Sequence, residues 1–360
     1  RAFAMKRSAS FLPIPGCALS ALGASSKLGV LFFVVYDGDM AKLVNTFSWS
    51  HSASGDFENC RRKRYWSKYG AWGGWERDAT SECKTAYRLN KMTNRFCLYG
   101  IAAEDAVMWM LKEVQAGRNP TQEKAFDTVA RPALRLAWDE SKGKAWERFP
   151  KAACLHEHYY PQFNNMTDRE IMEQIANVVK GCLKGFEEKV LPRLADVTPE
   201  MEVQVGVVGK GDPEHFFFEG VKIYAIPDYV FVRDGVWHIL DWKSGAAKDI
   251  HREQVGLYAL WAWEKHQIPP EKVVLSLEYL QHGEHQTFTV SSEDLEGVRD
   301  RIRESVQDMS QYLVDSDIQK NLALPKPEWD MCYEPGLCKS CEFFQLCQPE
   351  LKDVLGDEIA

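Results

Sequence analysis

The chain has 360 residues, of which 45% are hydrophobic and 27% charged, and its formal net charge at pH 7 is −8. This composition is typical of a folded globular protein and excludes a disordered one. The longest apolar run, residues 28–36, has about half the length that a membrane helix requires, so we expect no membrane span or membrane partner. The acidic balance also excludes a surface that is basic throughout, so a nucleic acid would have to be held by a local patch or through metal ions.

Residues 1–39 show neither helical nor strand periodicity over a useful length. We expect them to be an extension that is not native, read through upstream of a true start at Met40. A signal peptide is the alternative interpretation, but Pro13 and Pro15 interrupt its apolar stretch.

Helical periodicity dominates the next section, which we place at residues 40–200. The hydroxyls of residues 48–54 can cap a helix over residues 57–69. Helical spacing then returns over three further ranges, 100–116, 122–146 and 168–190.

The periodicity changes at Met201, where alternating and β-branched residues begin. Strands are predicted over residues 202–208, 215–232, 236–242, 273–280 and 286–290, and helices over 250–266 and 292–313. Both faces of the central strands are apolar, which predicts an α/β (α+β) fold with a mixed sheet covered by helices on both faces. We expect this core to occupy residues 201–325, and a cysteine-rich tail that packs on the N-terminal segment to occupy 326–360.

Two aspartates are predicted to face each other across a hairpin. Asp-Gly at positions 234 and 235, between two strand-like runs, is the strongest short-range signal for a two-residue hairpin loop. In that register Asp228 lies opposite Asp241, and opposed like charges destabilise a sheet unless something neutralises them. Mg²⁺ or Mn²⁺ would do so, because these ions prefer carboxylate oxygens. Lys243 lies two residues beyond Asp241 and therefore on the same face.

This arrangement suits the hydrolysis of a phosphodiester. The cation would polarise a phosphoryl oxygen and lower the pKa of a bound water, and Lys243 could orient or deprotonate that water. An acid-x-Lys triplet alone is a weak signal because the chain contains five, but only the one that begins at Asp241 ends a predicted strand with a second acid opposite. The alternative is a solvated salt bridge at the end of a strand. The apolar neighbours argue against it, since they would bury the charges at a cost.

The same residues resemble a known signature. Pro227-Asp228 followed by Asp241-Trp242-Lys243 is similar to the motif of PD-(D/E)XK nucleases. The resemblance implies a restriction-endonuclease-like αβα core and a metal-dependent DNA nuclease. It also implies that Asp228, Asp241 and the backbone carbonyl of Trp242 bind Mg²⁺ or Mn²⁺, and that Lys243 is catalytic.

Two further motifs resemble the RecB-like branch of that superfamily. Gln254-x-x-x-Tyr258 on the next predicted helix is similar to its Gln-x-x-x-Tyr motif, which implies that both side chains hold the DNA backbone or position the catalytic lysine. Gly100-x-x-x-Glu104 is similar to an earlier motif whose last residue reaches the metal, so Glu104 is a third candidate ligand. Its alternative role is that of an exposed acid on a helix face.

Three cysteines in the tail indicate a metal site. Cys338-x2-Cys341-x5-Cys347 supplies three soft thiolates, and an iron-sulfur cluster or a zinc site needs a fourth. Cys332 would complete a local knuckle that could hold Zn²⁺. Cys60 is the distant alternative.

The surroundings of Cys60 resemble the opening of iron-sulfur RecB-like nucleases, including the AddB nuclease domain and the CRISPR-associated exonuclease. The resemblance implies a [4Fe-4S] cluster held by Cys60, Cys338, Cys341 and Cys347. Such a cluster would tie the two ends of the chain together, because metal binding is coupled to folding.

A dense basic and aromatic run follows the first of these cysteines: Arg61, Arg62, Lys63, Arg64 and Tyr65. Cations pair with phosphates and aromatic rings stack on unpaired bases, so we expect this run to contact DNA. The alternative interpretation is a solvated helix face.

These observations together predict a cytoplasmic DNA nuclease, exonucleolytic on single strands or duplex ends, that acts in repair, recombination or the processing of CRISPR or phage DNA. Its protein partner would be a helicase, a recombination protein or a CRISPR protein. The alternative is a noncatalytic DNA-binding scaffold of a recombination or CRISPR complex that keeps the nuclease fold.

Overall fold

The computed structural model describes residues 43–206 and 213–359. The expectations for residues 1–39 and the proposed start at Met40 lie outside these ranges. Within them, no helix combines the length and the apolar character that crossing a membrane requires.

Two mixed sheets are present in the described part of the chain. The larger has the order β4-β5-β6-β7, with bounds Tyr229–Arg233, Val236–Lys243, Val273–Tyr279 and Glu284–Thr289. In it β5 and β6 run parallel and the two outer pairs antiparallel. The smaller has the order β1-β3-β2, with bounds Ser48–Ser50, Val221–Tyr224 and His215–Phe218.

The predicted hairpin register is confirmed. Asp234 and Gly235 have φ values of 52° and 74°, as a two-residue turn with both central residues in the left-handed region requires. The ladder pairs Tyr229 with Leu240. Its continuation by one residue brings Asp228 opposite Asp241.

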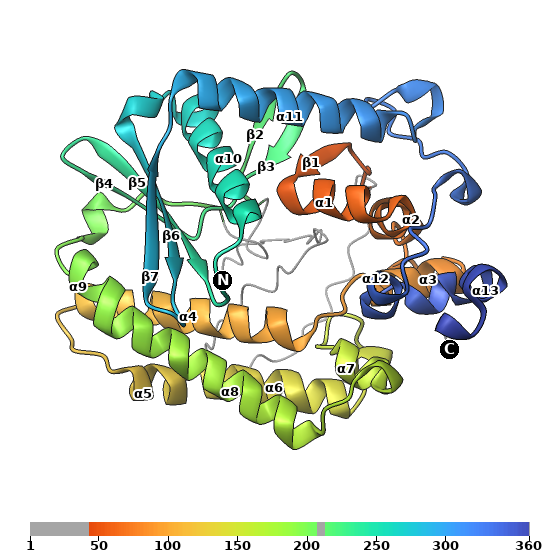
Figure 1. The fold of residues 1–360 in the computed structure, drawn as a ribbon, viewed down its shortest axis with the longest axis horizontal. Coiled ribbons are helices and arrows are strands. Elements are labelled where there is room, and N and C mark those ends of the chain that lie inside the picture. The colour runs from red at the N-terminus through yellow and green to blue at the C-terminus, as the bar shows by residue number, and fades with distance from the viewer. Residues whose placement is uncertain (1–42, 207–212, 360) are drawn as a thin grey trace, which may run out of the picture.

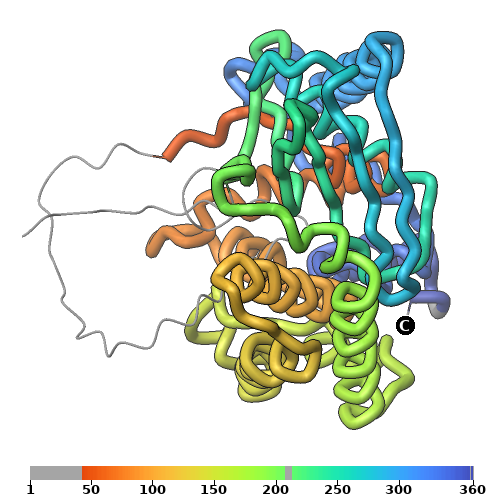
Figure 2. Tube along the Cα trace, turned by 90° about the vertical axis from the view of Figure 1, so that its left-hand side faces the viewer, coloured from red at the N-terminus to blue at the C-terminus, as the bar shows by residue number. Residues whose placement is uncertain are grey.

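Helices cover both faces of the larger sheet, as predicted. One face is covered by α10 (Asp249–His266) and α11 (Ser292–Ser310), the other by α4 (Arg95–Gln115) and α8 (Asp168–Gly185). Figures 1 and 2 show these layers from two directions. Successive side chains of β5 point to opposite faces of the sheet. Ile239 packs into the core with α10 and α11, and Leu240 packs into the core with α4 and α8. The fold is thus an αβα restriction-endonuclease-like arrangement.

The two ends of the described chain share a core. Short helices from both ends contribute to it or lie beside it: α1 (His51–Asn59), α2 (Arg61–Tyr65), α3 (Ser81–Leu89), α12 (Pro335–Ser340) and α13 (Phe344–Leu355). Trp66 and Tyr87 from the first segment pack with Phe343 and Phe344 from the tail. Figure 1 shows α12 and α13 beside α2 and α3. The remaining α-helices lie between α4 and β2 along the chain: α5 (Gln122–Ala125), α6 (Arg131–Lys142), α7 (His156–Tyr159) and α9 (Leu191–Leu194).

Two of the strand predictions are wrong. The range 215–232 is three strands and not one, because Glu219 and Gly220 adopt positive φ values of 48° and 78° and reverse the chain between β2 and β3. Residues 202–206 form only an isolated bridge, from Glu202 to Phe231. The chain leaves that edge after the bridge, because Gly206 exchanges hydrogen bonds with Glu214. Residues 207 and 208 lie outside the described ranges.

Candidate active site

Asp228, Asp241 and Lys243 meet at the end of the hairpin opposite its turn. Asp228 Oδ2 accepts a hydrogen bond from the Trp242 backbone N–H at 2.6 Å. Asp241 is 1% exposed, and its Oδ2 lies 2.5 Å from Lys243 Nζ. Lys243 and Asp241 therefore share one face, as the strand period predicts.

Helix α10 closes a ring of polar contacts around the lysine. Lys243 Nζ donates to Gln254 Oε1 at 2.8 Å, and Gln254 Nε2 donates to the Tyr258 hydroxyl at 2.9 Å. The Tyr258 hydroxyl in turn donates to Asp241 Oδ1 at 3.0 Å, and the ion pair from Asp241 to Lys243 completes the ring. Gln254 and Tyr258 can do this together because residues four apart lie on the same face of a helix.

Glu104 joins the two aspartates from the opposite layer. It lies on α4, half-buried, and burial together with Asp105 and Asp241 raises the pKa of its carboxyl to about 7. Burial, Asp241 and Glu104 likewise raise the pKa of Asp228 well above its ordinary value. Three carboxyl groups are thus held where their charges repel one another and little water screens them.

This donor set fits a divalent cation chemically. Asp241 Oδ2 is buried, and the polar contact described for it is the Lys243 ammonium at 2.5 Å. Neutralising several buried carboxylates is what Mg²⁺ or Mn²⁺ does at oxygen-rich sites. In the arrangement described, no three His, Cys, Asp or Glu side chains lie close enough to hold one ion together, so metal binding would draw the carboxylates inward.

Sequence reasoning missed several side chains around this site. Tyr279 is the neighbour of Lys243 in the parallel ladder, and its hydroxyl lies 3.3 Å from His251 Nδ1. Burial lowers the pKa of His51, and the nearby Lys243 ammonium contributes to the lowering. His251 precedes Gln254 by three residues on one helix face, so its position was predictable; His51 and Tyr279 reach the site only through tertiary packing.

The basic run does not form a DNA-facing patch as a whole. Arg62 is 3% exposed, and it donates to the Trp329 carbonyl at 2.7 Å and pairs with Glu350 at 2.9 Å. Arg64 is 4% exposed and donates to the Ser48 carbonyl at 3.2 Å. For these two residues the predicted DNA contact is wrong, because their guanidinium groups are buried and bind other parts of the chain.

The rest of the run is also engaged within the protein. Lys63 Nζ pairs with Asp56 at 2.8 Å, and the Arg61 guanidinium lies 4.1 Å from the centre of the Phe57 ring. Tyr65 packs against Trp329, with ring centroids 5.7 Å apart. Arg61, Lys63 and Tyr65 keep partial exposure, so DNA contact by these three stays a prediction.

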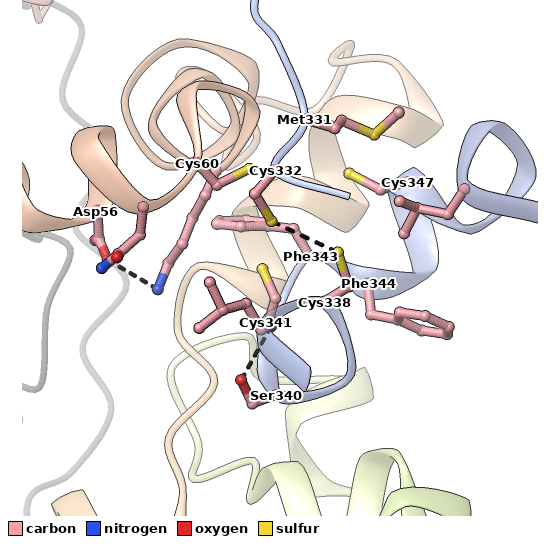
Figure 3. A pocket seen from close by; sticks show the side chains of 14 residues that line it. Asp56, Cys60, Met331, Cys332, Cys338, Ser340, Cys341, Phe343, Phe344 and Cys347 are labelled. Atoms are coloured by element: carbon pink, nitrogen blue, oxygen red, sulfur yellow. Dashed lines mark hydrogen bonds and ion pairs between the residues drawn. The ribbon is translucent and has the colours of Figure 1, made fainter. Parts of the chain in front are cut away.

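Five cysteines of the described chain line one cavity of about 100 Å³: Cys60, Cys332, Cys338, Cys341 and Cys347. Cys60 lies between α1 and α2, whereas the others come from the tail (Figure 3). Both candidates for the fourth ligand are therefore present beside the Cys338, Cys341 and Cys347 triad.

The thiols around the cavity are a chemically suitable donor set for either a cluster or a zinc ion. A tetrahedral zinc site with Zn–S bonds of about 2.3 Å brings its sulfurs within roughly 3.8 Å of one another. Cys332 and Cys338 have that separation, 3.7 Å, but no group of three in the described chain is compact enough to hold one ion. An iron-sulfur cluster spreads its cysteines over different iron atoms, so a ring of thiols around a cavity is an appropriate donor set.

The fold and the hairpin site together define a class of protein: the proteins with a restriction-endonuclease-like fold. Residues 105–348, about two thirds of the chain, match the PD-(D/E)XK nuclease superfamily, and the chain belongs to that superfamily. The match includes both aspartates, the lysine and the tail cysteines; it begins one residue after Glu104 and excludes Cys60. No curated protein matches the chain.

Proposed function

We propose that this protein is a metal-dependent DNA nuclease of the RecB-like branch. The observation that carries the proposal is the closed ring of contacts from Lys243 through Gln254 and Tyr258 to Asp241, beside a second aspartate. A structural salt bridge at a strand end needs no such ring, whereas a lysine that acts on a phosphate must be held in one position.

In this proposal Asp228, Asp241, Glu104 and the Trp242 carbonyl hold Mg²⁺ or Mn²⁺. The bound ion would supply a polarised phosphoryl oxygen and a water of lowered pKa. The chain supplies the lysine. Burial alone would lower the pKa of Lys243, but Asp241 and Asp228 outweigh burial and raise it, which favours an ammonium that orients the water and stabilises negative charge on the phosphate.

The test is cleavage of end-labelled single-stranded and duplex DNA in the presence of Mn²⁺. We expect Lys243→Ala to lower the rate by at least about 100-fold, the cost of losing one positioned charge-stabilising group. Lys272→Ala is the matched control, since Lys272 is exposed and lies near the opposite end of β6. Equal cleavage by the native protein and Lys243→Ala would contradict the proposal, and a noncatalytic scaffold would show no cleavage in any of the three. The labelled ends also distinguish exonucleolytic from internal cutting and show its polarity.

We further propose that Cys60, Cys338, Cys341 and Cys347 hold a [4Fe-4S] cluster. The cavity that the four thiols share supports this. Burial raises the pKa of the Cys338 thiol to about 12 and of the Cys347 thiol to about 11, so both are protonated without a metal and would each release a proton on binding one. Iron, sulfide and zinc analysis of protein purified without oxygen, with its visible spectrum, distinguishes the cluster from Zn²⁺.

A cluster of this kind implies a reducing compartment such as the cytoplasm. Exonucleolytic processing of DNA ends, together with a helicase, recombination or CRISPR partner, is also part of the proposal.

A further inference from the structure

Cys332 is a fifth thiol in a cavity that a four-ligand cluster would fill. Its Sγ lies 3.7 Å from Cys338 Sγ, six positions along the chain. It also lies close enough to Cys60 to raise the pKa of the Cys60 thiol. Figure 3 shows its side chain between those two cysteines. The surplus thiol therefore contacts one of the proposed ligands and lies beside a second.

The two residues of the closer pair differ in burial. Cys338 is 8% exposed, whereas Cys332 is less deeply buried and precedes two exposed residues, Tyr333 and Glu334. A small oxidant would therefore reach Cys332 first. The second thiol lies within 4 Å and is ready to react with the product.

We propose that Cys332 and Cys338 form a reversible disulfide whenever the cluster is absent, an inference that rests on the proposed cluster for its significance. Hydrogen peroxide would oxidise the Cys332 thiol to a sulfenic acid and release one water. The Cys338 sulfur then attacks the Cys332 sulfur, forming the S–S bond and releasing the second water. The sum is two thiols and one peroxide giving one disulfide and two waters.

The disulfide would prevent a cluster from forming again. Cys338 supplies one of the four proposed ligands, and a sulfur in a disulfide does not bind iron as a thiolate does. An oxidised protein would thus stay without a cluster until a dithiol reduces the bond. The disulfide would protect Cys338 from irreversible oxidation, because a dithiol can reduce the S–S bond and restore both thiols.

The experiment uses the full chain after anaerobic removal of the cluster by a chelator. The cluster-free protein receives one equivalent of hydrogen peroxide, free thiols are alkylated, and the linked peptides are identified by mass spectrometry. In parallel, iron and sulfide are offered with and without prior treatment with dithiothreitol, and loading is followed by iron content and visible absorbance. The variants are Cys332→Ser and, as a control, Cys83→Ser, whose thiol donates to the Trp72 carbonyl away from the cavity.

We expect a Cys332–Cys338 linkage in the native protein and in Cys83→Ser, and at least about a fivefold loss of loading that dithiothreitol restores. Cys332→Ser should load fully before oxidation and lose loading in a way that dithiothreitol restores poorly. A Cys60–Cys332 linkage, an unmodified Cys332, or a Cys332→Ser variant that behaves like the native protein would overturn the inference. Peptide linkage is read from cluster-free protein, so a native chain that never binds iron would overturn the proposed cluster and leave the disulfide result intact.

Discussion

Asp241 is the residue on which the candidate site is organised. It is 1% exposed, and its two oxygens have separate partners, Tyr258 at 3.0 Å and Lys243 at 2.5 Å. A buried carboxylate without partners costs free energy, so each partner contributes to holding its charge in place. Removing a single polar atom from one of these partners should therefore disturb the position of the Asp241 carboxylate.

Removing the Tyr258 hydroxyl should impair catalysis more than folding. We expect Tyr258→Phe to lower kcat by about 10- to 100-fold with little change in KM, because losing a hydrogen bond to a charged group costs about 1.5–3 kcal/mol and frees Lys243 from its fixed position. Steady-state cleavage kinetics measure the effect. Tyr69→Phe is the control, since Tyr69 donates a similar bond to Asn321 at 2.8 Å outside the site. A proportional loss in both variants would contradict a specific role for Tyr258.

Glu104 should make the metal-free protein less stable as the pH rises. Its pKa is about 7 in the folded chain against an ordinary 4.5, because of burial and the neighbouring acids, so the folded state binds this proton more tightly than the unfolded state. That stability is complete below about pH 4.5 and is lost as the pH passes about 7.

Glu104→Gln has no such proton to lose. We therefore expect its free energy of unfolding, relative to the native protein, to rise between pH 5 and pH 8 by about 1–3 kcal/mol. Urea unfolding in the presence of EDTA provides the measurement, and Asp139→Asn at an exposed position on α6 is the control. A difference independent of pH would show that Glu104 is not buried against the aspartates.

At the scale of elements, helix α1 connects the two sites. Its first residue, His51, lies near Lys243, and Cys60 follows its last residue. Nine residues of α-helix span about 13 Å, so α1 is a short rigid link from the cysteine cavity to the hairpin carboxylates. The N-terminal segment thus takes part in both sites, although the aspartates lie far away in sequence.

The contact between α8 and the sheet depends on a glycine. A Cβ at Gly185 would lie 1.8 Å from the Leu280 carbonyl oxygen, which is backbone and cannot rotate away. We expect Gly185→Ala to destabilise the protein by about 1–3 kcal/mol through overpacking.

Gly297→Ala in α11 is the matched control, since nothing lies within 4 Å of its Cβ position. There alanine should stabilise the helix by up to about 1 kcal/mol. Thermal unfolding of the two variants should therefore shift in opposite directions. Similar shifts would indicate that α8 lies further from Leu280 than described.

At the scale of the whole molecule, the chain ends are joined by polar and apolar contacts around the cysteine cavity. Arg62 from the first segment binds Trp329 and Glu350 from the tail, and both segments contribute to one core. A cluster held from both ends would add a covalent connection to these contacts.

Losing Cys60 should therefore lower the stability of the protein as well as remove the visible absorbance of the cluster. We expect Cys60→Ala to lose the visible absorbance and iron content and to lower the free energy of unfolding by roughly 2–5 kcal/mol, the range for losing a native disulfide, which is a comparable cross-link. Cys83→Ala should retain both the absorbance and the stability. A Cys60→Ala variant that keeps its iron would make Cys332 the fourth ligand.

Much of the hairpin was decided by local geometry. An Asp-Gly turn and a side-chain period of two are sufficient to place Asp228 opposite Asp241 and Lys243 on the same face, because both depend on neighbours in sequence. The spacing of Gln254 and Tyr258 is local in the same sense, and the apolar faces of the strands imply two covering layers.

The fate of the basic run depended instead on the tertiary structure. The amino acids of residues 61–64 are those of a DNA-binding surface, but packing buries two of them. The tail supplies the partners of Arg62, whereas Arg64 donates to the Ser48 carbonyl of β1. The approach of Glu104, His51 and Tyr279 to Lys243 likewise requires α4, α1 and β6 to pack around the hairpin. Periodicity predicts which side chains share a face. Packing across the whole chain determines which distant segment buries that face. This packing therefore decides whether a charged side chain lies against solvent, a carboxylate or a metal.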